Sequence, residues 1–337
     1  MEFSRITLLL TVAIMSSLSQ SHAENSARGA VLLVANKSDR TLGIVDPEAG
    51  QQAATVAEDA TTGHEVAASP DGRLAYVPIY GNSGVGLPGT DGRKMLVIDI
   101  ATRKVSGNLD FGHGVRPHCA MFGPKDGLLY VTTEIDQTVT VIDPHTLKVV
   151  GTIPTGQSES HMLAITPDGR RGYTANVGPG TVSVLDMQAR KTLAVIPVSA
   201  HVQRISVSVD GSTAFTSDQT KPQLAAIDTA TNKVKTWIPL PAKGYGTAPT
   251  PDGHWLVVAM PSANKVAVVD LGTMKVAHTI EVPSAPQEIL VRPDGRVAYA
   301  SCDSSHKIAV IRTSDWSVEK LIDAGAGADG LAWAPAK

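Results

Sequence analysis

The chain has 337 residues, of which 42% are hydrophobic and 18% are charged, and its 30 glycines and 21 prolines indicate frequent turns. This composition predicts a globular protein with a sizeable core and argues against a disordered chain. The formal net charge of −3 at pH 7 provides no electrostatic footprint for a nucleic-acid backbone or an anionic membrane surface, so we expect neither as a partner.

The first 23 residues are predicted to be a signal peptide. Arg5 supplies a positive charge, an apolar run follows at 6–18, and Ser21-His22-Ala23 places small residues two apart. We expect cleavage after Ala23 and a mature protein, 24–337, that is periplasmic or secreted. No segment reaches the roughly 20 apolar residues that a membrane-spanning helix needs. Cys119 and Cys302 would then enter an oxidising compartment, where they could be bridged, free or metal-bound.

One turn motif repeats at a fixed spacing. Asp-Gly pairs fall every 42 residues from Asp126 to Asp294, after a first step of 55 residues from Asp71. Each period reads as short alternating strands separated by Gly, Pro, Asn and Asp; one unit, for example, predicts strands at 163–166, 172–175, 181–185 and 193–197, and no helix. Four antiparallel strands in about 40 residues, repeated, predict the blades of a β-propeller.

The two ends of the chain indicate how the ring closes. The N-terminal piece 29–56 lacks a first strand, and the C-terminal piece 329–335 resembles a first strand with nothing after it. Pairing of these pieces in one blade predicts a single all-β domain, 24–337, with seven blades and no open edges. A six-bladed or open arrangement would leave one piece unpaired.

Two short motifs resemble those of a known family. Tyr130-Val131-Thr132-Thr133 and Tyr173-Thr174-Ala175-Asn176, each followed by a Val-rich strand ending in Asp, are similar to YVTN-type β-propeller repeats. The resemblance covers nearly the whole mature chain and implies the propeller fold. Relatives include lactonase-like enzymes, surface-layer proteins and proposed binding proteins, so it implies no single function. Stretches at 80–92, 115–119 and 159–162 are similar to an exported bacterial subfamily, from which no catalytic residue is carried over.

Alignment of the seven units on the end of each first strand gives one column that is polar throughout. Its members are His64, His118, His161, Gln203, Tyr245, Gln287 and Asp329. Two residues further on, the same strands turn apolar. Because the first strand of each blade lines the central channel, we expect this column to form a polar ring at one mouth of the channel. Three histidines from successive blades make that ring a candidate active site.

Other residues are expected at the same mouth, because the connection after each second strand returns there. The connections and the residues flanking the strand starts supply Asn36, Glu65, Arg116, Cys119, Glu134, Glu159, Asn176, Arg204, Asp218, Cys302 and His306. The first unit also carries about 13 extra residues between Ile79 and Lys94. We expect this Gly-rich insertion to be a lid or binding loop over His64, with a tolerated surface loop as the alternative.

The residue types at the mouth suggest acid–base or metal chemistry. His64, His118 and His161 are candidate ligands of a divalent zinc, copper or iron ion, and, with Glu65 and Glu159, candidate catalytic residues. The candidate ligand-binding residues are Arg116, Arg204, Gln203, Tyr245, Gln287, Asp329, Glu134 and Asn176. Without a metal, His, carboxylate and Arg side chains would still serve acid–base chemistry on an ester or lactone, the reaction that the lactonase-like resemblance implies.

Two classes of function remain open. The first is a small-molecule site, either binding only or enzymatic as a metal-assisted or lactonase-like hydrolase or lyase. The second is an interaction platform for a protein or surface partner. Six of the nine histidines of the mature chain fall on the mouth face and aromatic residues are only 4% of the chain, which favours the first class. Histidines solvated in a water-filled channel are the non-functional alternative.

Overall fold

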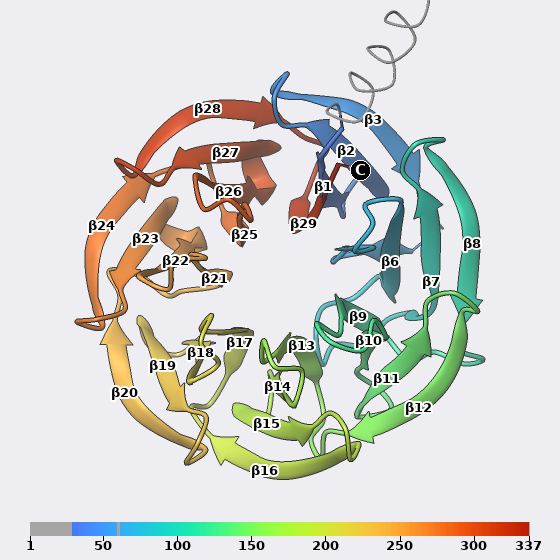
Figure 1. Cartoon of the computed structure of the whole chain (residues 1–337), viewed down its shortest axis with the longest axis horizontal. Coiled ribbons are helices and arrows are strands. Elements are labelled where there is room, and N and C mark those ends of the chain that lie inside the picture. The colour runs from blue at the N-terminus through green and yellow to red at the C-terminus, as the bar shows by residue number, and fades with distance from the viewer. Residues whose placement is uncertain (1–28, 59–60, 337) are drawn as a thin grey trace, which may run out of the picture.

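The computed structural model describes residues 29–58 and 61–336, which form a ring of seven four-stranded antiparallel sheets around a central axis (Figure 1). In blade 2 the innermost strand is split in two, so that sheet has five strands. The all-β seven-bladed fold predicted from the repeat is therefore confirmed. The predicted signal peptide lies outside the described residues.

The blades are numbered in chain order, and their strands run from the axis outward. Blade 1 contains β29 (Ala328–Ala334), β1 (Val31–Asn36), β2 (Thr41–Asp46) and β3 (Gln51–Ala57). Blade 2 contains β4 (Thr62–Gly63), β5 (Ala67–Ala68), β6 (Leu74–Gly81), β7 (Asp91–Asp99) and β8 (Lys104–Asp110). Blade 3 contains β9 (Pro117–Phe122), β10 (Leu129–Thr133), β11 (Thr138–Asp143) and β12 (Lys148–Pro154).

The remaining blades follow the same order. Blade 4 contains β13 (Ser160–Ile165), β14 (Arg171–Asn176), β15 (Thr181–Asp186) and β16 (Lys191–Pro197). Blade 5 contains β17 (Val202–Val207), β18 (Thr213–Asp218), β19 (Gln223–Asp228) and β20 (Lys233–Pro239). Blade 6 contains β21 (Thr247–Pro249), β22 (Trp255–Met260), β23 (Lys265–Asp270) and β24 (Lys275–Glu281). Blade 7 contains β25 (Pro286–Val291), β26 (Val297–Cys302), β27 (Lys307–Arg312) and β28 (Ser317–Asp323).

Two single-turn 3-10 helices, η1 (Pro261–Ala263) and η2 (Asp303–Ser305), join strands in blades 6 and 7. The sequence analysis predicts no helix there. Each replaces a tight turn and ends at a residue with left-handed backbone, Asn264 or His306. No helix in the described part of the chain is long and apolar enough to cross a membrane.

The ring closes through antiparallel pairing of the last strand with the first. In blade 1, Leu33 of β1 lies opposite Ala332 of β29. Both residues are buried in the same apolar cluster. This pairing confirms the predicted closure by the two ends of the chain and leaves no open sheet at the joint.

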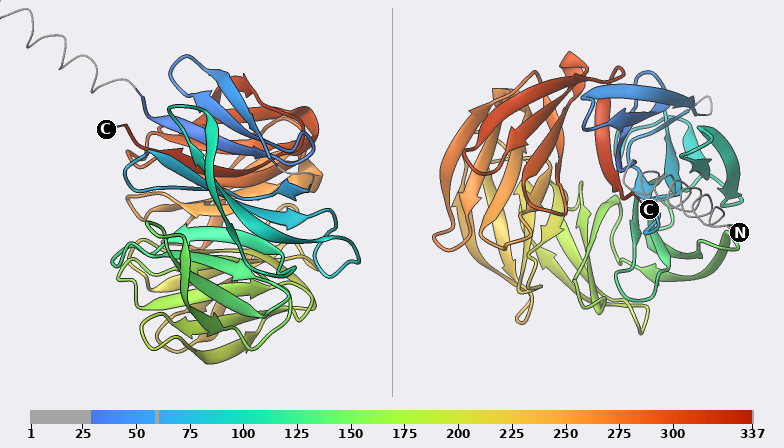
Figure 2. Two further views of the ribbon diagram at one scale, coloured as in Figure 1. Left: turned by 90° about the vertical axis from the view of Figure 1, so that its right-hand side faces the viewer. Right: turned by 45° about the horizontal axis from the view of Figure 1, so that its top comes forward.

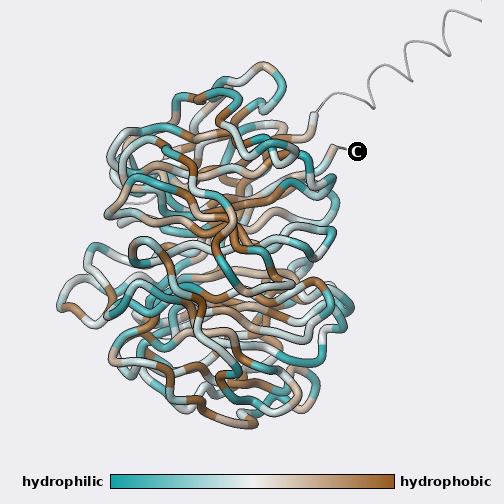
Figure 3. Tube along the Cα trace, turned by 90° about the vertical axis from the view of Figure 1, so that its left-hand side faces the viewer, coloured by the Kyte–Doolittle hydropathy of each residue, from teal (hydrophilic) through white to brown (hydrophobic). Residues whose placement is uncertain are grey.

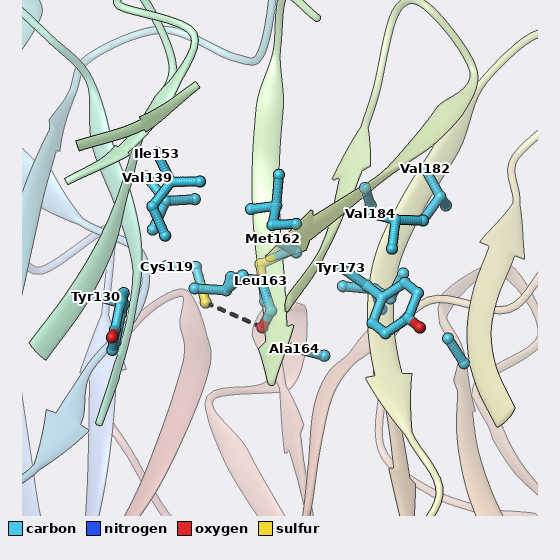
Figure 4. Packing of buried hydrophobic residues seen from close by; sticks show 14 of the residues in the cluster. Cys119, Tyr130, Val139, Ile153, Met162, Leu163, Ala164, Tyr173, Val182 and Val184 are labelled. Carbon is cyan, nitrogen blue, oxygen red and sulfur yellow. Dashed lines mark hydrogen bonds between the residues drawn. The ribbon is translucent and has the colours of Figure 1, made fainter. Parts of the chain in front are cut away.

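The middle strands of each blade are buried on both faces because neighbouring blades cover them. In blade 4, β14 and β15 are almost wholly buried, whereas β16 alternates between exposed and covered residues. Figure 4 shows the packing between blades 3 and 4, where the thiol of Cys119 contacts the carbonyl oxygen of Leu163. Tyr173, on β14, belongs to the same apolar cluster. Hydrophilic residues gather at the loops at the ends of the strands (Figure 3).

The repeated Asp-Gly turns are structural, as their position predicts. At the 168–169 turn, Oδ1 of Asp168 accepts hydrogen bonds from the hydroxyl of Thr166 and the backbone N–H of Arg170. Gly169 follows with φ of +73°, a left-handed conformation that favours glycine.

The hairpin of β6 and β7 projects from the face opposite to the C-terminus (Figure 2).

Most inner strands begin with a β-bulge, and this irregularity positions the site. In blade 4, Ser160 pairs with Asn176 and Met162 with Ala175, so His161 is an extra residue without its own partner. In blade 5 the extra residue is Arg204, one position further along its strand than His161. Blades 1, 3 and 7 show the same kind of register shift at Val34–Asn36, Val131–Thr133 and Pro286–Ile289. A bulge reorients side chains, which brings them toward the channel at this mouth.

Candidate functional site

Three of the predicted histidines meet at the channel mouth. The ring centroids of His118 and His161 lie 3.5 Å apart, and those of His64 and His118 lie 5.6 Å apart. Tyr80, from β6, packs against all three, with centroid distances of 5.1 Å to His64, 5.3 Å to His118 and 5.6 Å to His161. We call these four residues the histidine cluster.

Burial keeps these imidazoles neutral. It lowers the pKa of His64 to about 4 and the pKa of His118 well below its ordinary value, since His118 is only 2% exposed and other imidazoles surround it. The pKa of His161 is also lowered by burial, although the neighbouring Glu134 opposes the effect. At neutral pH each ring therefore has one nitrogen lone pair that can accept a proton or a hydrogen bond.

Glu134 orients one histidine of this cluster. Its Oε2 accepts a 2.8 Å hydrogen bond from the hydroxyl of Tyr80 and lies 3.3 Å from Nδ1 of His161. Burial raises the pKa of Glu134, but the bonds from His161 and Tyr80 and the charge of Arg116 outweigh it and hold this pKa below its usual value. Because an ionised carboxylate only accepts, Nδ1 of His161 must carry the ring proton and Nε2 the lone pair.

A second buried group surrounds Arg204. Its guanidinium pairs with Glu65, with Oε2 of Glu288 at 2.5 Å and with Oδ1 of Asp329 at 3.0 Å. The ring of Tyr245 lies 4.9 Å from its central carbon. We call Arg204, Glu65, Glu288 and Asp329 the arginine network. Three carboxylates of the protein thus already surround Arg204, a candidate ligand-binding residue.

The arginine network retains a proton at neutral pH. Burial raises the pKa of Glu65 to about 8 despite the attraction of Arg204, and burial also raises the pKa of Glu288. Burial would raise the pKa of Asp329 as well, but Lys37, 3.2 Å away, and Arg204 lower it. The pKa of Asp329 is thus held low, whereas the pKa of Glu65 lies above neutral pH.

The metal site predicted at His64, His118 and His161 stays a prediction, and in the described residues the three rings pack against one another. The rings of His118 and His161 are tilted by only 31° and stack on each other, while His64 meets His118 edge-on. No group of three or more His, Cys, Asp or Glu side chains within 29–58 and 61–336 is arranged to hold a metal ion.

The insertion forms a pocket next to the cluster. Its loop, 82–90, joins β6 to β7 and is held by Arg116, which donates to Asp91 at 2.5 Å and to the carbonyl oxygen of Leu87 at 2.7 Å. Beneath the loop lies a pocket of about 410 Å³, lined by Gly86, Leu87, Pro88, Asp91, Arg116, Glu134, Ile135, Gln137, Ser158 and Glu159. The loop therefore contacts blades 3 and 4, and its expected position over His64 stays a prediction.

The other predicted site residues lie at the mouth, in the pocket beneath the loop or inside the blades. Gln203, Tyr245 and Gln287 are partly buried at the mouth, and Nε2 of Gln203 lies 3.4 Å from the hydroxyl of Tyr245. Glu159 lines the pocket and accepts a 2.7 Å hydrogen bond from the backbone N–H of Gly178. Asn176 is fully buried within blade 4, where it bonds Ser160, Thr181 and Ser183. Cys119 and Cys302 are free and buried.

Sequence reasoning missed four residues of this region. Tyr80, Glu288, Lys37 and Asp91 carry contacts described above, yet none belongs to the polar column. Glu288 occupies the position one residue after the column, as Glu65, Cys119 and Arg204 do, so the same alignment would have found it. The contact of Tyr80 with blades 3 and 4 has no sequence signal, because it depends on the curvature of the ring.

No family model and no curated protein matches the chain. Among solved structures, one titled Kuenenia stuttgartiensis Hydrazine Synthase is similar in fold, with a TM-score of 0.72 and 21% sequence identity. The match covers 85% of this chain and 93% of that chain. At this identity the likeness supports the propeller fold alone.

Proposed function

We propose that the channel mouth is a small-molecule site at which the protein catalyses acid–base hydrolysis, or a related elimination, of an ester or lactone. The observation that carries the proposal is the contact between His161 and the buried, ionised Glu134, 3.3 Å apart, within a cluster of neutral imidazoles. A carboxylate that fixes the tautomer of a histidine makes its other nitrogen an oriented general base.

Each residue has a role in this proposal. Nε2 of His161 takes a proton from the attacking water as the carbonyl carbon becomes tetrahedral. Glu65, which retains its proton at neutral pH, protonates the leaving oxygen. His64 and His118 provide hydrogen-bond acceptors and exclude bulk water; Nδ1 of His118 is buried and has no partner in the described part of the chain. No step uses a metal ion.

Two further assignments belong to the proposal. The chain is a member of the YVTN-type repeat family, on the strength of the motifs at 130–133 and 173–176. It is exported and cleaved after Ala23, on the strength of the apolar run and the small residues before the cleavage point. N-terminal sequencing of the exported protein should begin at Glu24; a retained leader would contradict export with cleavage.

The direct test is a panel of alkyl esters, aryl esters, and γ- and δ-lactones. We expect hydrolysis of at least one class by the native protein, and losses of about 100-fold in kcat/KM for His161→Asn, the size expected for removal of a general base. His145→Asn, at the exposed turn between β11 and β12, is the matched control and should retain full activity. Activity that is indifferent to His64, His118 and His161 would remove the mouth as the active site.

An interaction platform is the second candidate, and one observation favours it. Apolar side chains are exposed on the neighbouring outer strands β12 and β16, at Val149, Val150, Leu193 and Val195. Exposed apolar groups on adjacent edge strands are typical of protein contacts. If this rim is an interface, Val150→Lys should abolish association with the partner and leave channel chemistry intact.

A further inference from the structure

Three buried polar atoms at the channel mouth have no hydrogen-bond partner within the described residues. They are Nδ1 of His118, Oε1 of Gln203 and Nε of Arg204. His118 is only 2% exposed and Arg204 only 3%. Buried polar groups are almost always hydrogen-bonded, because an unpaired one has lost its water without compensation. Three such atoms at one mouth therefore indicate a ligand that supplies the missing partners.

Two of the three atoms flank the same aromatic ring. Gln203 and Arg204 are consecutive residues at the bulge of β17. Nε2 of Gln203 lies 3.4 Å from the hydroxyl of Tyr245, and the guanidinium carbon of Arg204 lies 4.9 Å from the centroid of that ring. The bulge thus brings two successive side chains to one partner, which a regular strand with alternating side chains would not do.

The third atom is linked to the same region through blade 4. Nη1 of Arg204 lies 3.5 Å from Sδ of Met162, the residue that follows His161 on β13. The rings of His161 and His118 stack with their centroids 3.5 Å apart, and the charge of Arg204 contributes to the lowered pKa of His118. The three atoms therefore belong to one polar region of the mouth.

Gln203 and His118 each offer a hydrogen-bond acceptor. The amide nitrogen of Gln203 is directed to the hydroxyl of Tyr245, so the atom without a partner is the carbonyl oxygen. The backbone of His161 accepts a hydrogen bond from the ring of His118. Because Nδ1 has no partner among the described residues, that donor is Nε2, and Nδ1 carries the lone pair.

Arg204 offers a hydrogen-bond donor. Its Nη1 and Nη2 pair with Glu65, Glu288 and Asp329, whereas its Nε–H has no acceptor in the described part of the chain. Oε2 of Glu288 also lacks a hydrogen bond, but its ion pair with Nη1, at 2.5 Å, already compensates it. A guanidinium N–H can only donate, so Nε requires an acceptor atom.

The charges around Arg204 favour a neutral ligand. Three acidic side chains, Glu65, Glu288 and Asp329, already surround the guanidinium, and Lys37 lies 3.2 Å from Asp329. An anion at Nε would be repelled by these acidic groups. A cation would be repelled by the guanidinium, and an ammonium or guanidinium ligand has no acceptor atom for Nε.

One donor and two acceptors match a primary carboxamide, which has one carbonyl oxygen and two N–H groups. We infer that the mouth binds small neutral carboxamides. The carbonyl oxygen of the ligand accepts from Nε of Arg204, and its amide N–H groups donate to Oε1 of Gln203 and Nδ1 of His118. The inference rests on the proposed small-molecule site at this mouth, but it needs no hydrolysis.

The probe is propionamide, and ethyl methyl ketone and propionate are analogues of the same size and shape. The ketone lacks the N–H donors, and propionate lacks them and is charged. The readout is the shift of the Met162 methyl signal in NMR titrations. We expect saturable binding of propionamide, at least 10-fold tighter than that of either analogue and nearly independent of salt. Equal binding of amide and ketone would overturn the inference, as would tighter binding of propionate.

A conservative variant separates binding from folding. Gln203→Met keeps the size of the side chain but removes the acceptor, so it should weaken propionamide at least 10-fold and leave the ketone unaffected. Gln223→Met is the matched control, because Gln223 is a half-buried glutamine of the same blade whose Nε2 donates to Asp218 at 2.9 Å. It should not change the affinity for propionamide. Unchanged affinity in Gln203→Met, with a native spectrum, would overturn the inference.

The two proposals fail in different assays. A protein that hydrolyses an ester or lactone but does not bind propionamide would overturn the carboxamide inference and leave the hydrolysis proposal intact. A protein that binds propionamide through Gln203 but hydrolyses no member of the panel would support the inference and contradict only the hydrolysis.

Discussion

Nδ1 of His161 lies 3.3 Å from Oε2 of Glu134, and both side chains are almost fully buried. The two residues come from neighbouring blades, with His161 on the bulge that begins β13 and Glu134 directly after β10. Rigid strands hold both partners, so the orientation of the imidazole is fixed before any ligand binds. The hydrolysis proposal and the predictions below depend on this arrangement.

Tyr80→Phe should weaken the orientation of Glu134. The variant removes the 2.8 Å hydrogen bond to Oε2, so we expect kcat/KM to fall about 10-fold and the free energy of unfolding to fall by about 1–2 kcal/mol. Tyr130→Phe removes a similar 2.7 Å bond to Asp126, beyond the far end of β10, and serves as the control. Equal losses of activity in both variants would show that Tyr80 acts only through stability.

Arg204→Met should destabilise the fold strongly. It leaves Glu65, Glu288 and Asp329 together in a buried site without their shared cation, so the free energy of unfolding should fall by about 3–5 kcal/mol in urea titrations. Arg93→Met removes a pair with Asp110 in which both side chains are 40–50% exposed, and should leave the free energy of unfolding nearly unchanged. A small loss at Arg204 would mean that the carboxylates reach water.

Glu65 should make stability decline in alkali. Its folded pKa is raised to about 8 from an ordinary value of 4.5, so its stabilising contribution is complete below pH 4.5 and is lost as the pH rises through about 8. The buried histidines act in the opposite direction, but only as the pH falls below 6.5. Thermal unfolding of Glu65→Gln should therefore show a smaller decline in Tm between pH 6.5 and 8.5. An unchanged slope would contradict an acidic, protonated Glu65.

Neither native cysteine should react with a thiol reagent in the folded protein. Burial raises the pKa of both thiols, Cys119 and Cys302, to about 12, and both side chains are enclosed. Labelling with a disulfide reagent should count zero thiols in buffer and two in denaturant. Ser158→Cys places a thiol at the exposed edge of the pocket and should label at once. Rapid labelling of the native protein would contradict the burial of these thiols.

The fold could be predicted because its signals are local and repeated. The Asp-Gly spacing follows from turns that the aspartate carboxylate and the following glycine build by themselves, as at Asp168 and Gly169. The strands expected in blade 4 differ from the observed ones only at their ends, by at most three residues. Ring closure followed from the incomplete pieces at the two ends of the chain.

The site could be predicted only to the level of which residues share the mouth. Column alignment brought His64, His118 and His161 together, but it assumed regular strands, whereas bulges direct Arg204 and Glu288 inward as well. The stacking of His118 on His161 depends on the angle between blades, which no sequence period encodes. The amide of Asn176 donates to hydroxyl groups inside its own blade, contacts that column alignment does not predict.

A double-mutant cycle of His161→Gln and Glu134→Gln, measured as kcat/KM on the best substrate of the panel, tests the central claim most directly. If Glu134 acts through His161, each single variant should lose about 100-fold, and the double variant should lose little more than either one. Multiplicative losses, or full activity in His161→Gln with a native spectrum, would contradict a histidine base held by a buried carboxylate.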